Sequence, residues 1–255
     1  MSKSIFKALS GSTLGLLVIT TMVANFTELA PEKTLKNPQQ DLPVLAIDLH
    51  DTVLERDNKI AIKEILKTPM HGFKFIKRAL QYKKAKNHGQ TRVSIEEYIT
   101  KNSQDPEFDQ MVAKTVSCFK PIPGAIRFLN KLKQAGYKIF VFSNIGPKSY
   151  ELLCQDYPEL FSLFDGQVIV NPTNLTKDSP EAYKYCIKTI TEKIGYIPKK
   201  IILYDDSQAN CDLAKQTDPL FDAIVCQNSS RKKLVKSNAN LLRLLESYSP
   251  GKKLR

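Results

Sequence analysis

Short, continuously apolar runs recur along the chain, and segments of helical periodicity separate them. Each run is typical of a strand that is buried on both faces; they cover 44–47, 137–142, 166–170, 201–204 and 222–226. The helical segments carry apolar residues at helical spacing, and several begin at proline or end at glycine; they cover 123–136, 180–195, 207–216 and 234–246. The alternation predicts an α/β fold, a Rossmann-like parallel sheet covered by helices on both faces, with any site at the carboxyl ends of the strands.

One segment interrupts this alternation. Residues 56–117 contain no convincing strand but several helical patterns, including a capping box from Ser94 to Glu97. We therefore expect a small all-helical insertion after the first strand. The core α/β domain would then comprise 42–55 and 118–248, followed by a basic tail at 249–255.

The N-terminal segment has the pattern of a targeting sequence. Lys3 and Lys7 precede an uncharged stretch from Ala8 to Thr27, whose apolar centre has the length of a signal-peptide core and is short for a membrane span. We interpret 1–30 as an export signal or an N-terminal membrane anchor and 31–41 as a linker; a buried helix of the soluble domain is the alternative. The first interpretation predicts an exported protein, periplasmic or secreted, or a membrane-anchored one.

Composition narrows the function classes. The chain has 255 residues, of which 42% are hydrophobic, and this excludes disorder of the whole. Its net charge of +12 favours anionic partners, although a solvated basic surface explains it equally well. Five widely spaced cysteines without a CxxC pair indicate neither a zinc site nor a disulfide framework, and most are expected to be buried.

Polar residues follow four of the predicted strands. They are Asp48 with Thr52, Ser143 with Asn144, Lys177, and the pair Asp205 and Asp206 with Asn210. Any one of these stretches is often only a turn or a helix cap. Together, an acid, a hydroxyl, an ammonium and an acid pair form a phosphate site with a hard metal cation.

These stretches resemble the four motifs of the haloacid dehalogenase-like (HAD) hydrolase superfamily. The matching stretches are AIDLHDTVL, VFSN, Lys177 of KDSPEAY, and YDDSQAN, and the resemblance covers about 42–226. It implies an aspartyl-phosphate on Asp48, the nucleophile, and a helical cap formed by the insertion. The implied magnesium ligands are Asp48, the backbone carbonyl of His50, Asp205 and Asp206. Thr52, Ser143 and Asn144 would orient the nucleophile and phosphoryl group, Lys177 would neutralise both, and Asn210 would support the fourth loop.

His50 departs from the pattern of the family's phosphatases, which carry an aspartate there. That acid protonates the leaving oxygen and then activates water, and its loss costs a factor of about 10² to 10⁴ in rate. Magnesium and Lys177 nearby should lower the pKa of His50, so that it acts as a base rather than an acid. We therefore expect substrates whose leaving groups need no proton, such as acyl or aryl phosphates. Asp51 is the alternative acid, but its side chain should point differently.

Three functions follow from this site. The first is a magnesium-dependent phosphatase that acts on a small phosphorylated substrate. The second is a dehalogenase-type hydrolase, because a halide leaves without a proton. The third is a catalytically weak or inactive binding protein that keeps the fold.

A basic amphipathic pattern lies within the insertion. Phe73, Ile76 and Leu80 share one helical face, and the surrounding bases are Lys74, Lys77, Arg78, Lys83, Lys84, Lys86 and Arg92. Such a helix would steer an anionic substrate or rest on an acidic membrane surface. The alternative is that its apolar face packs on the rest of the insertion. Aromatic residues are too sparse to indicate nucleic acid, and no pattern predicts an oligomeric state.

Overall fold

The computed structural model describes residues 42–91, 93–170, 173, 175–228 and 231–248, with backbone alone at 231 and 232. The expected export signal or anchor and its linker, 1–41, lie outside these residues, as do Arg92 and the basic tail at 249–255. Within the described residues, no helix combines the length and the apolar character that crossing a bilayer requires.

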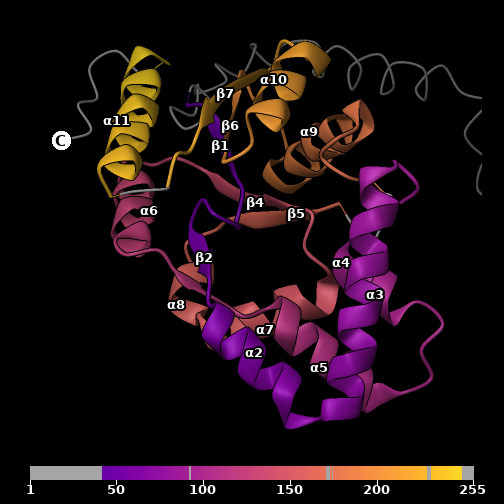
Figure 1. Ribbon diagram of the computed structural model, residues 1–255. Helices are drawn as coiled ribbons and strands as arrows, with labels where there is room; N and C mark the ends of the chain where they lie inside the picture. The colour runs from indigo at the N-terminus through magenta and orange to yellow at the C-terminus, as the bar shows by residue number, and fades with distance from the viewer. Residues whose placement is uncertain (1–41, 92, 171–172, 174, 229–230, 249–255) are drawn as a thin grey trace, which may run out of the picture. The chain divides into compact units, whose positions relative to one another are not determined.

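A five-stranded parallel sheet forms the centre of the fold (Figure 1). Its order is β5 (Gly166–Ile169), β4 (Ile139–Ser143), β1 (Val44–Ile47), β6 (Ile201–Asp205) and β7 (Phe221–Val225). All five predicted strands are confirmed to within two residues. The three inner strands, β1, β4 and β6, are buried along their whole length because helices cover both of their faces.

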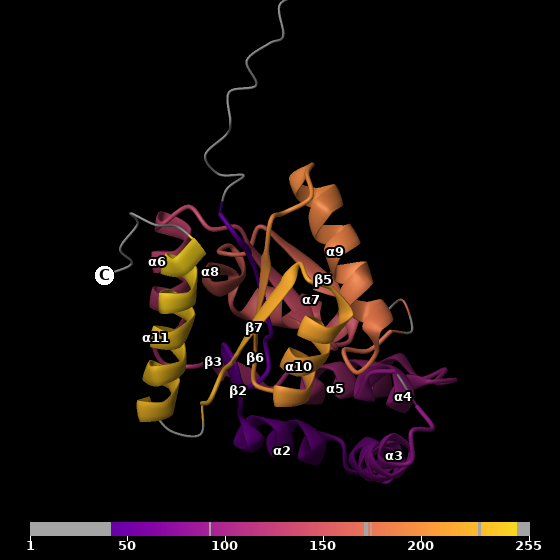
Figure 2. The ribbon, with the colours of Figure 1, turned by 90° about the horizontal axis from the view of Figure 1, so that it is seen from above.

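The two faces of the sheet have separate cores. Leu45 and Ile47 point to one face, which is covered by α6 (Ala125–Gln134), α7 (Pro147–Asp156), α8 (Pro158–Phe161) and α11 (Arg231–Tyr248). Val44 and Ala46 point to the other face, against α9 (Pro180–Ile194) and α10 (Gln208–Thr217). Figure 2 shows the two groups of helices on opposite sides of the sheet. The predicted α/β class is therefore confirmed, whereas α7 and α8 were not predicted, because only a narrow stripe of each is buried.

Four helices form the insertion, which confirms its all-helical character: α2 (Asn58–Lys67), α3 (Pro69–Asn87), α4 (Ile95–Thr100) and α5 (Pro106–Val116). They enclose a small core of their own that includes Phe75, Ile99 and Phe108. Ser94 caps α4 as expected, since its Oγ accepts a hydrogen bond of 3.0 Å from the backbone N–H of Glu97.

Packing of the α3 stripe inside the insertion is ruled out. Phe73, Ile76 and Leu80 are exposed to solvent. The buried positions of α3 are Gly72, Phe75 and Ala85 instead. The apolar residues of this helix thus occupy two faces, and only one of them faces the insertion.

A short antiparallel ribbon joins the insertion to the core. It pairs β2 (Leu54–Arg56) with β3 (Phe119–Pro121), where the chain leaves the core and returns to it. The ribbon was not predicted from the sequence, because its two strands have only three residues each and carry charged side chains. It places Phe119 close to the loop that follows β1.

Candidate functional site

Two acids and one lysine meet at the carboxyl ends of the strands. Asp48 follows β1 and Asp205 ends β6, and these strands are neighbours in the sheet. The Nζ atom of Lys177 lies 2.5 Å from Oδ1 of Asp48 and 2.6 Å from Oδ2 of Asp205. None of the three residues is more than 5% exposed. Parallel pairing of β1 and β6 therefore brings together acids that are far apart in the sequence.

The charges of this triad do not balance. Burial alone would lower the pKa of Lys177, but the carboxylates of Asp48 and Asp205 outweigh it and hold this pKa above its usual value. Burial raises the pKa of Asp48, and the neighbouring Asp205 adds to this effect while Lys177 opposes it. With both acids ionised, two negative charges share one ammonium. Because the pKa of Asp48 is raised to about 7, this excess of negative charge is only partly present near neutral pH.

Neighbouring loops hold the triad in place through side-chain hydrogen bonds. Oδ1 of Asn144 accepts a bond of 3.0 Å from the backbone N–H of Lys177. Oδ1 of Asp205 accepts bonds from the side chain of Asn210 at 3.0 Å and from the backbone N–H of Ser207 at 2.9 Å. Asn144 thereby positions the lysine, and Asn210 orients the acid.

Two aromatic residues complete this support, and the sequence analysis missed both. The hydroxyl of Tyr183 lies 2.8 Å from the carbonyl oxygen of Lys177 and 3.0 Å from that of Asn210. The ring centroid of Phe142 lies 5.1 Å from Nζ of Lys177, within cation–π range. Their apolar surroundings in a strand and a helix made them look like core residues. The one available signal was the place of Tyr183 in the first turn of α9, six residues after Lys177.

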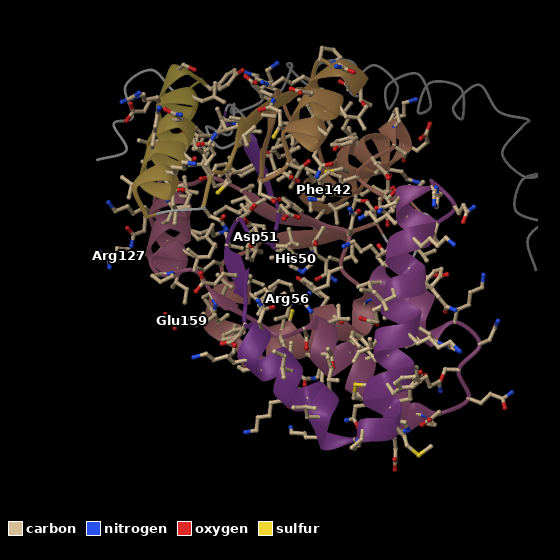
Figure 3. All side chains as sticks on the ribbon, viewed as in Figure 1. His50, Asp51, Arg56, Arg127, Phe142 and Glu159 are labelled. Carbon is tan, nitrogen blue, oxygen red and sulfur yellow. The ribbon has the colours of Figure 1, made fainter. Side chains whose placement is uncertain are left out.

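His50 follows Asp48 by two residues and contacts the β2–β3 ribbon. Figure 3 shows it beside Asp51 on the loop after β1. Its ring stacks on Phe119 with a centroid distance of 4.3 Å, and its buried Nε2 has no hydrogen-bond partner among the described residues. Burial, and then the charges of Lys177 and Arg56, lower the pKa of His50 to about 4. Its imidazole is therefore neutral near pH 7.

The other predicted residues are not bonded to the triad. Ser143 is fully buried, and its Oγ accepts a bond of 3.3 Å from the backbone N–H of Ile145. Thr52 is buried and lines a cavity of about 670 Å³ next to α6 and α11. No member of the triad lines this cavity. Asp206 and Asp51 are both exposed, and Asp51 occupies a left-handed turn with φ of 52°.

The carboxylate oxygens of Asp48, Asp205 and Asp206 are of the kind that binds a hard cation. In the described part of the chain, no three His, Cys, Asp or Glu side chains gather closely enough to hold a metal. The charge pattern nevertheless fits one, because burial and the carboxylates of Asp205 and Asp51 raise the pKa of Asp206. Carboxylate and carbonyl oxygens are the ligands that Mg²⁺ prefers.

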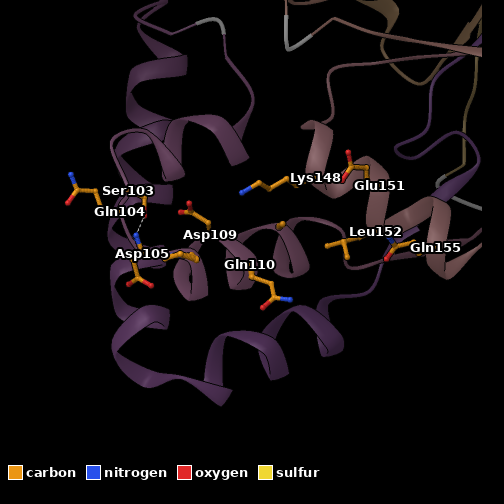
Figure 4. A pocket seen from close by; sticks show the side chains of 11 residues that line it. Ser103, Gln104, Asp105, Asp109, Gln110, Lys148, Glu151, Leu152 and Gln155 are labelled. Carbon is orange, nitrogen blue, oxygen red and sulfur yellow. Dashed lines mark hydrogen bonds between the residues drawn. The ribbon is translucent and has the colours of Figure 1, made fainter.

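The triad is closed to solvent in this conformation. A cavity of about 520 Å³ lies between α5 and α7, and its lining includes Asp109, Lys148 and Glu151 (Figure 4). Neither this cavity nor the one beside Thr52 is lined by a member of the triad.

A buried carboxylate of the insertion is bonded to the first turn of α7 in the core. Oε2 of Glu96, on α4, accepts bonds from the backbone N–H of Ser149, at 2.9 Å, and from its hydroxyl. Gly146 leaves room for this carboxylate, since a Cβ at that position would lie 2.4 Å from Oε2 of Glu96. The buried carboxylate of Glu96, from the insertion, thus accepts a backbone hydrogen bond in the first turn of α7.

Comparisons with known proteins agree with this architecture. A HAD family enzyme from Bacteroides thetaiotaomicron, in complex with magnesium and inorganic phosphate, is 19% identical over 74% of this chain and 96% of its own, with a TM-score of 0.53. L-2-haloacid dehalogenase from Xanthobacter autotrophicus is 16% identical over 81% of this chain and 87% of its own, with a TM-score of 0.54. The Bacillus subtilis protein YfnB, bound to magnesium, is 14% identical over 80% of this chain and 98% of its own, with a TM-score of 0.55.

At these identities, the likeness to solved structures concerns the fold alone. No curated protein matches the chain. The family model described as haloacid dehalogenase-like hydrolase matches residues 34–218, which is well over half of the chain. The protein therefore belongs to the haloacid dehalogenase-like hydrolases.

Proposed function

We propose that this hydrolase is a magnesium-dependent phosphatase that acts through Asp48 on a small phosphorylated substrate. The observation that supports it most is the pairing of buried Asp48 and Asp205 with a single ammonium, that of Lys177. The enzyme from Bacteroides thetaiotaomicron, which was crystallised with magnesium and inorganic phosphate, has the same fold.

The reaction would proceed in two steps. A carboxylate oxygen of Asp48 attacks phosphorus, and the leaving oxygen departs with the electron pair of its bond to phosphorus. Water then attacks phosphorus of the aspartyl-phosphate, which releases inorganic phosphate and restores the Asp48 carboxylate. Lys177 balances charge on both groups throughout, and Asn144 holds it in position.

Magnesium would be held by Asp48, the His50 carbonyl, Asp205 and Asp206, and would neutralise charge on the phosphoryl group. The neutral imidazole of His50 suits only one of the two steps. With its pKa near 4 it accepts a proton from attacking water but does not donate one to a leaving oxygen near pH 7. Acyl or aryl phosphates, whose leaving groups need no proton, are therefore the proposed substrates.

The test is phosphate release from an aryl and an alkyl phosphate, each with magnesium or with a chelator. We expect magnesium-dependent release that strongly favours the aryl ester, and a gain on the alkyl ester in His50→Asp. Equal rates of the native protein on both esters would exclude the proposed leaving-group preference. Bound magnesium without turnover of any phosphate by either protein would favour the third function, a binding protein.

A dehalogenase reaction is the second candidate. The absence of an acid at position 50 favours it, because Asp48 would displace a halide that leaves without a proton. The dehalogenase from Xanthobacter autotrophicus, solved with chloropropionic acid covalently bound, shares the fold at a TM-score of 0.53. Chloride release from 2-chloropropionate without phosphate release would decide for this reaction.

We also propose that residues 1–30 export or anchor the protein, on the evidence of their sequence pattern. Fractionation of cells that produce the full chain with a C-terminal epitope tests this. We expect the chain in the membrane or outside the cytoplasm, and removal of 1–30 should return it to the cytoplasm. Cytoplasmic full-length protein would contradict the proposal.

A further inference from the structure

Exposed apolar side chains concentrate on two helices of the insertion. Seven of the nine large hydrophobic residues that are exposed in the described part of the chain lie on α2 and α3, with exposures from 46% to 87%. We use six of them to define the α2–α3 face: Ile62, Leu66, Met70, Phe73, Ile76 and Leu80. Figure 2 shows α2 and α3 on the outer side of the insertion, with α4 and α5 between them and the core. An apolar surface of this kind indicates an interaction site.

The two helices do not need these residues for packing within the chain. Their inward sides already bury Ala61 and Phe75, and Ile65 and Ala79 pack against the core of the insertion. At Gly72 the helices approach so closely that a Cβ would lie 2.4 Å from the carbonyl oxygen of Ile65. A helix that is apolar on all sides is normally buried on all sides. The outward sides of α2 and α3 therefore indicate a surface that a partner covers.

The charges around this face specify the partner. No acid occurs from Thr68 to Ser94, and the exposed lysines on the same helices are Lys59, Lys63, Lys67, Lys77, Lys83, Lys84 and Lys86. On α2 the nearby acids are already engaged, since Glu64 pairs with Lys67 and Asp57 caps the helix. The surface therefore combines phenylalanine and aliphatic side chains with positive charge, as in helices that lie on anionic lipid.

We propose that the α2–α3 face binds the surface of an acidic lipid bilayer. Its apolar side chains enter the interface between headgroups and acyl chains, and its lysines contact lipid phosphates. A second copy of the chain fits less well, because a symmetric interface would bring these lysines against one another. Nucleic acid fits less well too, since Phe73 is the only exposed aromatic ring among the large apolar residues of this face.

The test is cosedimentation of the full chain with vesicles of phosphatidylcholine, with or without phosphatidylserine. We expect binding to the acidic vesicles that declines as salt is added. The double variant Phe73→Ser/Leu80→Ser should weaken binding at least about tenfold, because two large apolar side chains no longer leave water. Lys77→Glu/Lys84→Glu should also weaken it at least about tenfold, since each basic residue near such a surface contributes about 1 kcal/mol.

Matched controls come from the core. Ile197→Ser removes an apolar side chain that is 70% exposed, and Lys184→Glu reverses an exposed charge on α9. Both should bind as the native protein does. Circular dichroism melts of all variants show whether each is folded, so a loss of binding is not mistaken for unfolding.

Other outcomes would overturn the proposal. If the α2–α3 variants bind as well as the native chain does, the apolar stretch at 8–27 carries the binding. Equal binding to neutral and acidic vesicles would remove the role of the lysines. A native dimer that Phe73→Ser/Leu80→Ser converts to a monomer, without vesicle binding by either, would assign the face to a second copy. All of these readouts are independent of phosphatase activity.

Discussion

The core and the insertion depart from ordinary burial in opposite ways. The core buries charged groups, since Lys177, Asp48 and Asp205 are almost inaccessible and bonded to one another. The insertion exposes apolar groups, since Phe73 and Leu80 lie on the outside of α3. Buried charges cost stability unless they are paired, and in the core Lys177 pairs with both acids. An exposed apolar surface costs no folding free energy by itself but favours association, and for this reason we propose a partner for the α2–α3 face.

The largest expected effect concerns the nucleophile. Asp48→Asn should lower phosphate release by at least about 10⁴-fold, because the amide cannot attack phosphorus. Asp51→Asn is the control, since Asp51 is an exposed turn residue three positions away. Initial rates on an aryl phosphate measure both. A comparable loss in Asp51→Asn would mean that Asp51, and not the buried triad alone, carries the chemistry.

Removal of the buried ammonium should destabilise the core. Lys177→Met leaves Asp48 and Asp205 close together without their cation, and we expect a loss of about 3–5 kcal/mol in the free energy of unfolding. Urea denaturation measures it. Lys188→Met is the control, because the Lys188 side chain is 71% exposed and should change stability by less than about 0.5 kcal/mol. Equal stability of the two variants would refute the electrostatic description of the triad.

Two phenylalanines on α3 test the contrast between buried and exposed apolar groups within one helix. Phe75→Ala should cost about 3–4 kcal/mol, because Phe75 lies in the core of the insertion. Phe73→Ala should change stability by no more than about 0.5 kcal/mol, because it removes no internal packing. Thermal melts of both variants compare them. A large loss in Phe73→Ala would show that this side chain is needed inside the chain.

A smaller effect is expected where the insertion meets the core. Glu96→Ala removes the acceptor for the backbone N–H and hydroxyl of Ser149, and should cost about 1–3 kcal/mol. Glu107→Ala, at an exposed position of α5, serves as the control. Urea denaturation of both gives the difference. A Glu96→Ala protein as stable as the control would mean that this contact does not hold the insertion closed.

Local patterns in the sequence determined most of the core. The strands β1, β4 and β6 were predictable because a sheet covered on both faces needs continuously apolar runs, and Ser94 was predictable because a helix cap involves only four residues. The candidate residues Asp48, Lys177 and Asp205 were identified because each follows or ends a predicted strand. The departure at His50 could also be read directly from its motif.

Only the tertiary structure decided which groups meet. Lys177 contacts two acids because β1 and β6 pair in parallel, and Glu96 reaches Ser149 because α4 and α7 both pack against α5; neither pairing leaves a local trace in the sequence. The exposure of Phe73 was likewise undetermined, since periodicity defines an apolar face but not what covers it. A helix whose apolar residues occupy two faces allows either one to turn inward. Packing against Phe108 and its neighbours selected the side of Phe75 and left Phe73 facing outward.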